Sequence, residues 1–190
     1  MSTSQVYFRP KDLPELGYSA AQIPRLLRQG RVLRMGRGLY RWSDAPAAAT
    51  ESLSAVALRS PNAVVCLLSA LSFHEIGTQD PPQVWIAVGI RARRPTRTGV
   101  PVRVVRFSRA GMTIGVEKHH IAGVAVSVTS PARTIVDCFR YRRKIGLDVP
   151  LEALADALQR KTVTRGELMR MAEAFHQQSV MRPYLEAYSR

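Results

Sequence analysis

The chain has 190 residues, of which 46% are hydrophobic and 22% are charged, and these values favour a folded protein with a packed core over a disordered chain. No run of about 18 apolar residues is present, which argues against a membrane-spanning helix, and the first residues lack the basic and apolar regions of a signal peptide, so we expect a cytoplasmic protein. The 28 basic and 14 acidic residues give a net charge of +14, for which a polyanionic partner is the default expectation.

The first predicted elements are two short helices on either side of a turn. PKDLPEL, residues 10–16, predicts a brief helix that ends at Gly17, where glycine allows a positive φ. Ser19 and Gln22 have capping-box spacing for a second helix. Pro24 would disrupt the interior of that helix, which therefore either bends there or begins nearer Gln22. The apolar face of the second helix is formed by Ile23, Leu26 and Leu27.

After Gly30 the hydrophobic period changes to that of strands. The stretches RVLRM and LYRW flank a GRG turn, which predicts a β-hairpin. Helix, turn, helix and basic hairpin is the order of a winged helix-turn-helix, in which the second helix enters the major groove of DNA. The hairpin, or wing, then lies along the backbone or probes the minor groove.

We expect the DNA contacts on the second helix and the wing. Residues 1–45 hold eight basic and only three acidic residues. Arginine can read guanine edges and glutamine adenine edges. The alternative is a structural hairpin whose arginines are merely solvated. The predicted DNA-binding residues are Gln22, Arg25, Arg28, Gln29, Arg31, Arg34, Arg37 and Arg41.

Residues 43–50, SDAPAAAT, have the composition of a linker and predict a boundary between a domain at 1–45 and a domain at 50–190. The second domain is predicted to be a mixed α/β domain with a central sheet and C-terminal helices, so that the fold class is α+β. Its expected strands are 63–68, 83–88, 102–107, 111–121 and 124–129. Its expected helices are 50–60, 69–77, 130–144 (capped by Ser130), 151–161 and 164–178 (with a Thr164–Glu167 capping box).

Two further stretches are strongly basic. Residues 91–109 contain seven arginines and no acidic residue, and RYRRK follows at 140–144. We expect these stretches to extend the DNA footprint along the phosphate backbone. A solvated loop, an RNA contact and an acidic protein partner are the alternatives. The residues predicted for this secondary patch are Arg91, Arg93, Arg94, Arg97, Arg142, Arg143 and Lys144.

The pattern of chemically active residues favours a binding protein over an enzyme. Cys66 and Cys138 lie in apolar stretches without CxxC spacing, so we expect reduced core residues and neither a metal nor another cofactor. A metal-dependent nuclease needs clustered carboxylates, and VWIAV, VRVVRF and VAVSV contain none. His119 and His120 are adjacent in a strand and point to opposite faces. His74 is expected to be hydrogen-bonded at a helix end, and no nucleophile elbow surrounds it.

Three function classes therefore stand side by side. The first is a DNA-binding regulator. The second is a nucleic-acid-processing enzyme of nuclease type, or an RNA-binding protein of similar charge. The third is a protein-interaction module. They differ in what they predict for duplex DNA: preferential binding without turnover, cleavage that a chelator abolishes, or no binding at moderate salt.

Three stretches in the same order resemble the AbiEi family of antitoxins and transcriptional regulators from type IV toxin–antitoxin systems. They are RLLRQGRVLRMGRGLYRW, LLSALSFHEIG followed by PPQVWIAV, and GVAVSVTSPARTIVDCF. The resemblance implies an N-terminal winged helix that binds operator DNA and a C-terminal domain needed for antitoxin activity. It also implies repression of the family member's own promoter through inverted repeats, and a neighbouring gene for an AbiEii-type toxin, a nucleotidyltransferase.

The sequence departs from the family pattern at two points. The first helix of the winged module is short or absent, because only seven residues precede FRPKDL. Arg133 stands where many relatives carry an acidic residue, and we expect it to pair with Asp137 one turn on. We expect that pair to lie at the surface and to contribute little.

Overall fold

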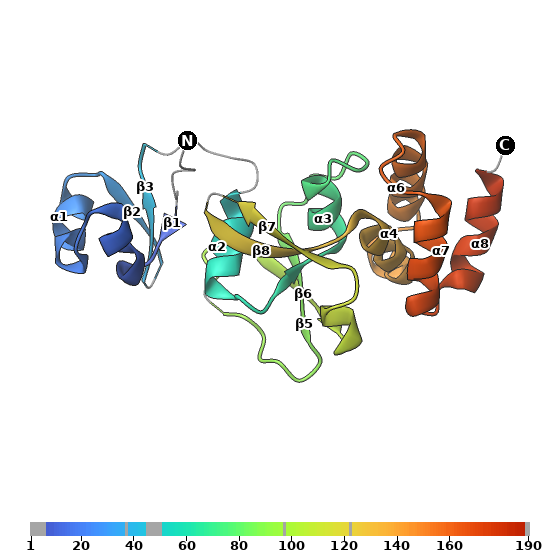
Figure 1. Ribbon diagram of the computed structural model, residues 1–190, viewed down its shortest axis with the longest axis horizontal. Coiled ribbons are helices and arrows are strands. Elements are labelled where there is room, and N and C mark those ends of the chain that lie inside the picture. The colour runs from blue at the N-terminus through green and yellow to red at the C-terminus, as the bar shows by residue number, and fades with distance from the viewer. Residues whose placement is uncertain (1–6, 37, 45–50, 97, 122, 189–190) are drawn as a thin grey trace. The chain divides into compact units, whose positions relative to one another are not determined.

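The computed structural model describes residues 7–36, 38–44, 51–96, 98–121 and 123–188, and the chain divides into two units (Figure 1). The first unit comprises Met1–Asn62, Pro95–Pro101 and Lys118–Val126, and the second comprises Ala63–Arg94, Val102–Glu117 and Ser127–Arg190. Most of the predicted linker, residues 45–50, lies outside the described residues, as do Arg37 and Arg97.

The described elements include short 3-10 helices, labelled η. The strands are β1 (Tyr7–Phe8), β2 (Val32–Gly36), β3 (Leu39–Trp42), β4 (Val64–Val65), β5 (Val84–Gly89), β6 (Val102–Phe107), β7 (Val116–Ile121) and β8 (Val124–Thr129). The helices are η1 (Pro10–Leu16), η2 (Ala20–Gln22), α1 (Ile23–Arg28), α2 (Glu51–Arg59), α3 (Leu67–Phe73), η3 (Ala110–Met112), α4 (Pro131–Arg140), α5 (Arg142–Ile145), α6 (Asp148–Gln159), α7 (Arg165–Ala174) and α8 (Gln178–Ala187). The mixture of helices with two sheets is an α+β fold.

The N-terminal module, residues 7–44, contains the predicted helix–turn–helix–hairpin order. Strands β2 and β3 pair in antiparallel fashion, and β1 adds to the other side of β3, so that β3 is the central strand of a three-stranded sheet. The chain thus enters this module as a strand within the described residues. The buried side chains that hold the module together are Phe8, Leu13, Ile23, Leu26, Val32 and Tyr40.

The second helix begins at Ile23, which places Pro24 in its first turn. The side chain of Gln22 accepts a 2.8 Å hydrogen bond from the Ser19 backbone amide, which confirms the capping box. Residues 20–22 form the 3-10 turn η2, and α1 starts only at Ile23. Pro24 is consequently in the first turn of α1, where a missing N–H costs no internal hydrogen bond.

The larger sheet has the strand order β6-β5-β4-β8-β7. Strand β5 runs parallel to β6 and antiparallel to β4, and β4 runs parallel to β8. Strands β6 and β8 have the predicted bounds. The prediction of a strand at 111–121 was wrong in its first half, because η3 ends at Met112 and Gly115 takes φ +65°. Similarly β4 is short, since Leu67 already begins α3.

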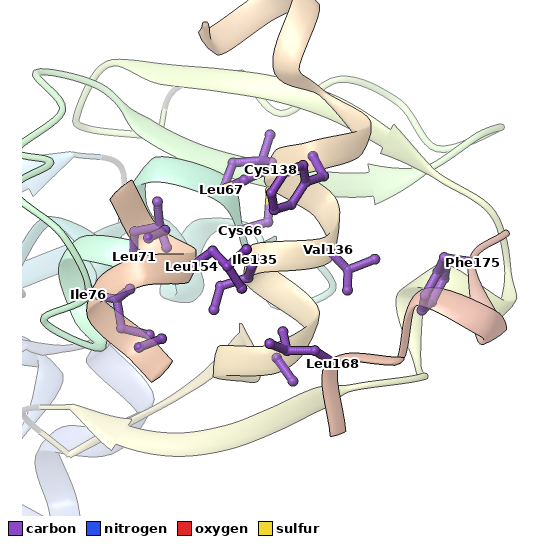
Figure 2. Packing of buried hydrophobic residues seen from close by; sticks show 14 of the residues in the cluster. Cys66, Leu67, Leu71, Ile76, Ile135, Val136, Cys138, Leu154, Leu168 and Phe175 are labelled. Carbon is purple, nitrogen blue, oxygen red and sulfur yellow. The ribbon is translucent and has the colours of Figure 1, made fainter. Parts of the chain in front are cut away.

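The core of the second unit is built around α4. Figure 2 shows Ile135, Val136 and Cys138 of α4 among side chains of α3, α6 and α7. Cys66 and Cys138 are buried and free, which confirms the prediction of reduced core residues. Burial raises the pKa of both thiols well above the usual value. Their role is therefore apolar packing.

The C-terminus contains one helix more than predicted. The capping box that precedes α7 is present, since Glu167 accepts a 2.7 Å hydrogen bond from the Thr164 amide and the Thr164 hydroxyl accepts one from the Glu167 amide. Helix α7 ends at Ala174, and His176 takes φ +55°. A further helix, α8, follows from Gln178. His176 is thus a residue of the turn between two helices.

Arg133 pairs with Asp137 as predicted, but the pair is in the core and not at the surface. The Nε of Arg133 donates to Asp137 Oδ2 at 2.8 Å, and the two side chains are 1% and 0% exposed. The guanidinium carbon lies 3.6 Å from the ring centroid of Phe175 and 4.9 Å from that of Phe107. The prediction of a small surface contribution was therefore wrong, because a helix position that looks solvated in sequence is covered here by Phe107 of β6 and by Phe175, which follows α7.

Candidate nucleic-acid interface

The exposed residues of α1 are Pro24, Arg25 and Arg28. Ile23 and Leu26 are 7% and 3% exposed and point into the module. The helical period places Arg25 and Arg28 away from that face, and both are exposed. Gln22, in the preceding turn η2, is exposed too, and its side chain accepts the capping-box hydrogen bond from Ser19. Gln29, at the end of the helix, is exposed as well. All four residues that were predicted on the second helix are thus exposed, and Arg25 and Arg28 share the outer face of α1.

The arginines of the hairpin separate into two groups. Arg31 and Arg34 are exposed. The Arg31 Nη2 donates a 3.2 Å hydrogen bond to the Tyr18 hydroxyl, which ties its guanidinium to the module. Arg37, at the turn, lies outside the described residues. Arg41 is only 9% exposed and is not on this surface.

The burial of Arg41 follows from strand pairing. Arg34 lies opposite Tyr40, whereas Arg41 lies opposite Leu33 on one side and Tyr7 on the other. Because side chains alternate along a strand, Arg34 and Arg41 point to opposite faces of the sheet. Strand β1 makes β3 a central strand, so β3 has no open edge, and Arg41 lies beside the buried Tyr7 of β1. Arg41 is thus the one described residue of the predicted set that the structure places away from solvent.

Contacts of Arg106 connect the two stretches of the secondary basic patch. Arg106 was not among the residues predicted for this patch. Its Nη1 donates to the carbonyls of Gly89 and Ala92, at the start of the arginine-rich connection. Its own carbonyl accepts a 3.2 Å hydrogen bond from the hydroxyl of Tyr141, which immediately precedes α5. Arg106 therefore links the connection to α5 within the second unit.

Most of the predicted patch residues are exposed around this link. The exposed members are Arg91, Arg93, Arg94, Arg143 and Lys144. Arg142 is half-buried and donates a 2.7 Å hydrogen bond to the Phe139 carbonyl, so it caps the end of α4. Arg97 lies outside the described residues. The alternation of β6 could have identified Arg106, since its neighbours Val105 and Phe107 are buried.

The residues with catalytic potential are engaged in structural contacts. His74 follows α3, is half-buried, and its Nε2 lies 2.7 Å from the Thr129 carbonyl. Ser69 accepts a hydrogen bond from the Trp85 amide at 2.9 Å. His119 is half-buried and His120 exposed, as alternation in β7 requires. Within the described ranges, no group of three or more His, Cys, Asp or Glu side chains is placed to hold a metal ion.

One surface hollow of about 340 Å³ lies in the second unit, between α3 and the start of β5. Trp85 forms part of its lining, and the Arg103 guanidinium lies 4.7 Å from the Trp85 ring centroid. Trp85 as a whole is only 5% exposed. The helices of the described chain include none long and apolar enough to cross a membrane.

Comparison with known proteins places these features in a family. Residues 2–41 match the model of a transcriptional regulator, AbiEi antitoxin, and residues 63–183 match the model of the AbiEi antitoxin C-terminal domain. No curated protein matches. The crystal structure of the RV2827C protein from Mycobacterium tuberculosis has a similar fold, with a TM-score of 0.63 over 94% of this chain and 72% of that one, at 16% identity. Because the two family models together span most of the sequence, the chain belongs to the AbiEi family of antitoxins and transcriptional regulators.

Proposed function

We propose that the protein represses its own promoter as the antitoxin of a type IV toxin–antitoxin operon, and that the domain expected at residues 1–45 acts as a winged helix-turn-helix. The observation that carries this proposal is the outer face of α1. It presents Arg25 and Arg28 to solvent, with the exposed Gln22 and Gln29 just before and after the helix, while Ile23 and Leu26 anchor it. Arg31 and Arg34 supply positive charge on the adjoining hairpin. The partner is double-stranded operator DNA with inverted repeats.

The antitoxin activity belongs, on this proposal, to the second domain. Its target is an AbiEii-type nucleotidyltransferase toxin. The domain counteracts the effect of this toxin, and the proposal does not require the two proteins to bind each other. A variant defective in DNA binding through α1 therefore retains antitoxin activity when it is co-expressed with the toxin at a fixed level.

The proposal is tested by fluorescence anisotropy on the DNA upstream of the protein's own gene and on a scrambled duplex, over a series of salt concentrations. A preference for the upstream DNA that survives physiological salt is expected. Arg28→Ala should weaken binding to that DNA by about 1–3 kcal/mol, the usual worth of a base contact. Arg182→Ala, which removes the same charge from an exposed position of α8, is the matched control and should leave the preference unchanged.

Two other outcomes would contradict the repressor. Equal affinity for both duplexes that disappears as salt rises would leave only a basic surface. Cleavage of the duplex that a chelator abolishes would instead favour the nuclease alternative.

A further inference from the structure

The face of the small sheet that points away from the module core is buried on β1 and β3, whereas Leu33 of β2, opposite Arg41, is 45% exposed. Tyr7, Leu39 and Arg41 share this face because of the strand register, and their exposed fractions are 1%, 1% and 9%. Glu51, the first residue of α2, lies against Arg41. Since Glu51 is outside the N-terminal module, the hairpin is contacted by a later part of the first unit.

The contact between Arg41 and Glu51 is a paired hydrogen bond between charged groups. The Nε and Nη2 atoms of Arg41 donate to Glu51 Oε1 at 2.9 and 2.7 Å, and Nη1 donates to the Trp42 carbonyl at 3.2 Å. The two side chains are 11% and 22% exposed. Two N–H groups of a planar guanidinium on one carboxylate fix direction as well as distance.

Tyr7 adjoins the same pair. Burial raises the pKa of the Tyr7 hydroxyl, Glu51 raises it further, and Arg41 opposes both. Because Tyr7 lies opposite Arg41 in the register between β1 and β3, strands β1 and β3 and helix α2 meet at these three side chains.

The other strand of the hairpin is approached by a second distant segment. Gly99 takes φ +83°, and a Cβ placed on it would lie 3.2 Å from the carbonyl oxygen of Met35 in β2. Thr98 beside it is 6% exposed. The segment Pro95–Pro101 belongs to the first unit. Any residue other than glycine at position 99 would meet both an unfavourable φ and the backbone of β2.

We propose that Glu51 and Gly99 are positioning residues for the β2–β3 hairpin, one acting on β3 through Arg41 and the other on β2 at Met35. This inference rests on the proposed function, since the purpose of the hairpin's position is DNA binding. Arg41 then serves the interface without contacting DNA, and the hairpin presents Arg31 and Arg34 from a scaffold that is completed outside the N-terminal module.

The test compares the full-length chain with its Glu51→Gln variant on the upstream DNA. Removing an acidic charge from a DNA-binding protein ordinarily strengthens binding. If Glu51 positions the hairpin, the variant instead loses affinity, roughly tenfold for one misplaced base contact, with the slope of log affinity against log salt unchanged. The matched control is Glu173→Gln, the same change at an exposed position of α7, which should not weaken binding.

A direct role for Arg41 makes the opposite predictions. Glu51→Gln would then release Arg41 and raise affinity, and Arg41→Ala would lower the salt slope by about one unit. Either result overturns the proposal. The exchanged pair Arg41→Glu with Glu51→Arg should recover most of the affinity if the ion pair is what matters, and it should not recover if Arg41 contacts a phosphate.

Hydrogen exchange in the absence of DNA separates this inference from the proposed function. Glu51→Gln should accelerate amide exchange in β3, and Gly99→Ala should accelerate it in β2, while the amides of α1 keep their protection. Unchanged exchange in both strands overturns the positioning role whether or not the protein binds its promoter. If the wild-type chain does not bind its promoter but the exchange pattern is as expected, only the proposed function is contradicted and the positioning role stands.

Discussion

Arg133 is held by more contacts than a pair with Asp137 alone would supply. Its Nη1 donates to the Ile114 carbonyl at 2.5 Å, and Phe175 lies close to its guanidinium. A Cβ on Gly115 would come within 2.8 Å of the Arg133 Cβ. The arginine thereby fixes the turn that precedes β7 to α4. Asp137 Oδ1, by contrast, is buried without a hydrogen-bond partner.

We expect Arg133→Met to destabilise the protein by about 3–5 kcal/mol, because it leaves the Asp137 carboxylate buried without its counter-charge. The double variant Arg133→Met with Asp137→Leu should recover much of this loss, since replacing both charges removes the penalty. Urea unfolding followed by circular dichroism measures both. A cost below about 1 kcal/mol for the single variant would match a surface pair and contradict the burial.

The titration of Asp137 gives a pH dependence with a defined sign. Burial raises its pKa from 3.8 to about 6, although Arg133 opposes the change. Between these values the folded state binds more protons than the unfolded state, so the stability that this residue contributes is complete below about pH 4 and is lost as pH rises through about 6. Relative to Asp137→Asn, the wild-type free energy of unfolding should decrease between about pH 4.5 and 7.5. A relative increase would show that the folded pKa is lowered.

Short sequence patterns predicted the helix ends that are capped by residues close by in the sequence. The capping boxes at Ser19 and Thr164 and the cap at Ser130 were readable because each satisfies its own helix end within a few residues. The α1 face of the candidate interface was readable for the same reason, from helical periodicity. Neither signal depends on what packs against the helix.

What the sequence could not predict depends on distant partners. Nothing near LYRW indicates that β1 will pair with β3 and that Glu51 will cover Arg41, so the arginine was expected to be exposed. Arg133 was expected at the surface because the rings that enclose it, Phe107 and Phe175, come from a strand and a turn far away in sequence. Helix α8 was not predicted, and it contains Pro183, a residue type that ordinarily disrupts a helix interior.

The N-terminal cap of α7 allows the stability of a single helix end to be tested. Thr164→Ala removes the hydroxyl that accepts from the Glu167 amide at 3.2 Å, and it should cost about 1 kcal/mol of unfolding free energy. Thr164→Ser keeps the hydroxyl and should cost only a small part of that. Thermal or urea unfolding measures the difference, and equal stabilities for the two variants would mean that the cap contributes nothing.

For the whole molecule, the charge of +14 is concentrated on surfaces that belong to different units. The residues of α1 and the hairpin lie in the first unit, and the exposed patch residues Arg143 and Lys144 lie in the second. If the patch contacts phosphates, it supplies affinity without sequence preference, whereas α1 supplies the preference. The two contributions can therefore be separated by mutation.

The double variant Arg143→Ala with Lys144→Ala should lower the salt slope by up to about two units and should weaken binding to upstream and scrambled DNA equally. Arg170→Ala with Arg182→Ala, which removes the same charge from exposed positions of α7 and α8, provides the comparison. An unchanged slope for the first pair would mean that the patch faces something other than DNA.

The division of the first unit into three stretches of chain also determines when it can be completed during synthesis. Its last stretch, Lys118–Val126, is translated after most of the second unit's strands. At about 5–20 residues per second, the ribosome needs roughly 6–25 s to pass from residue 1 to residue 126. Before then a nascent chain holds the basic helix α1 but lacks part of the unit that contains it. A product that terminates early, or a ribosome that stalls before this point, therefore yields an incomplete first unit.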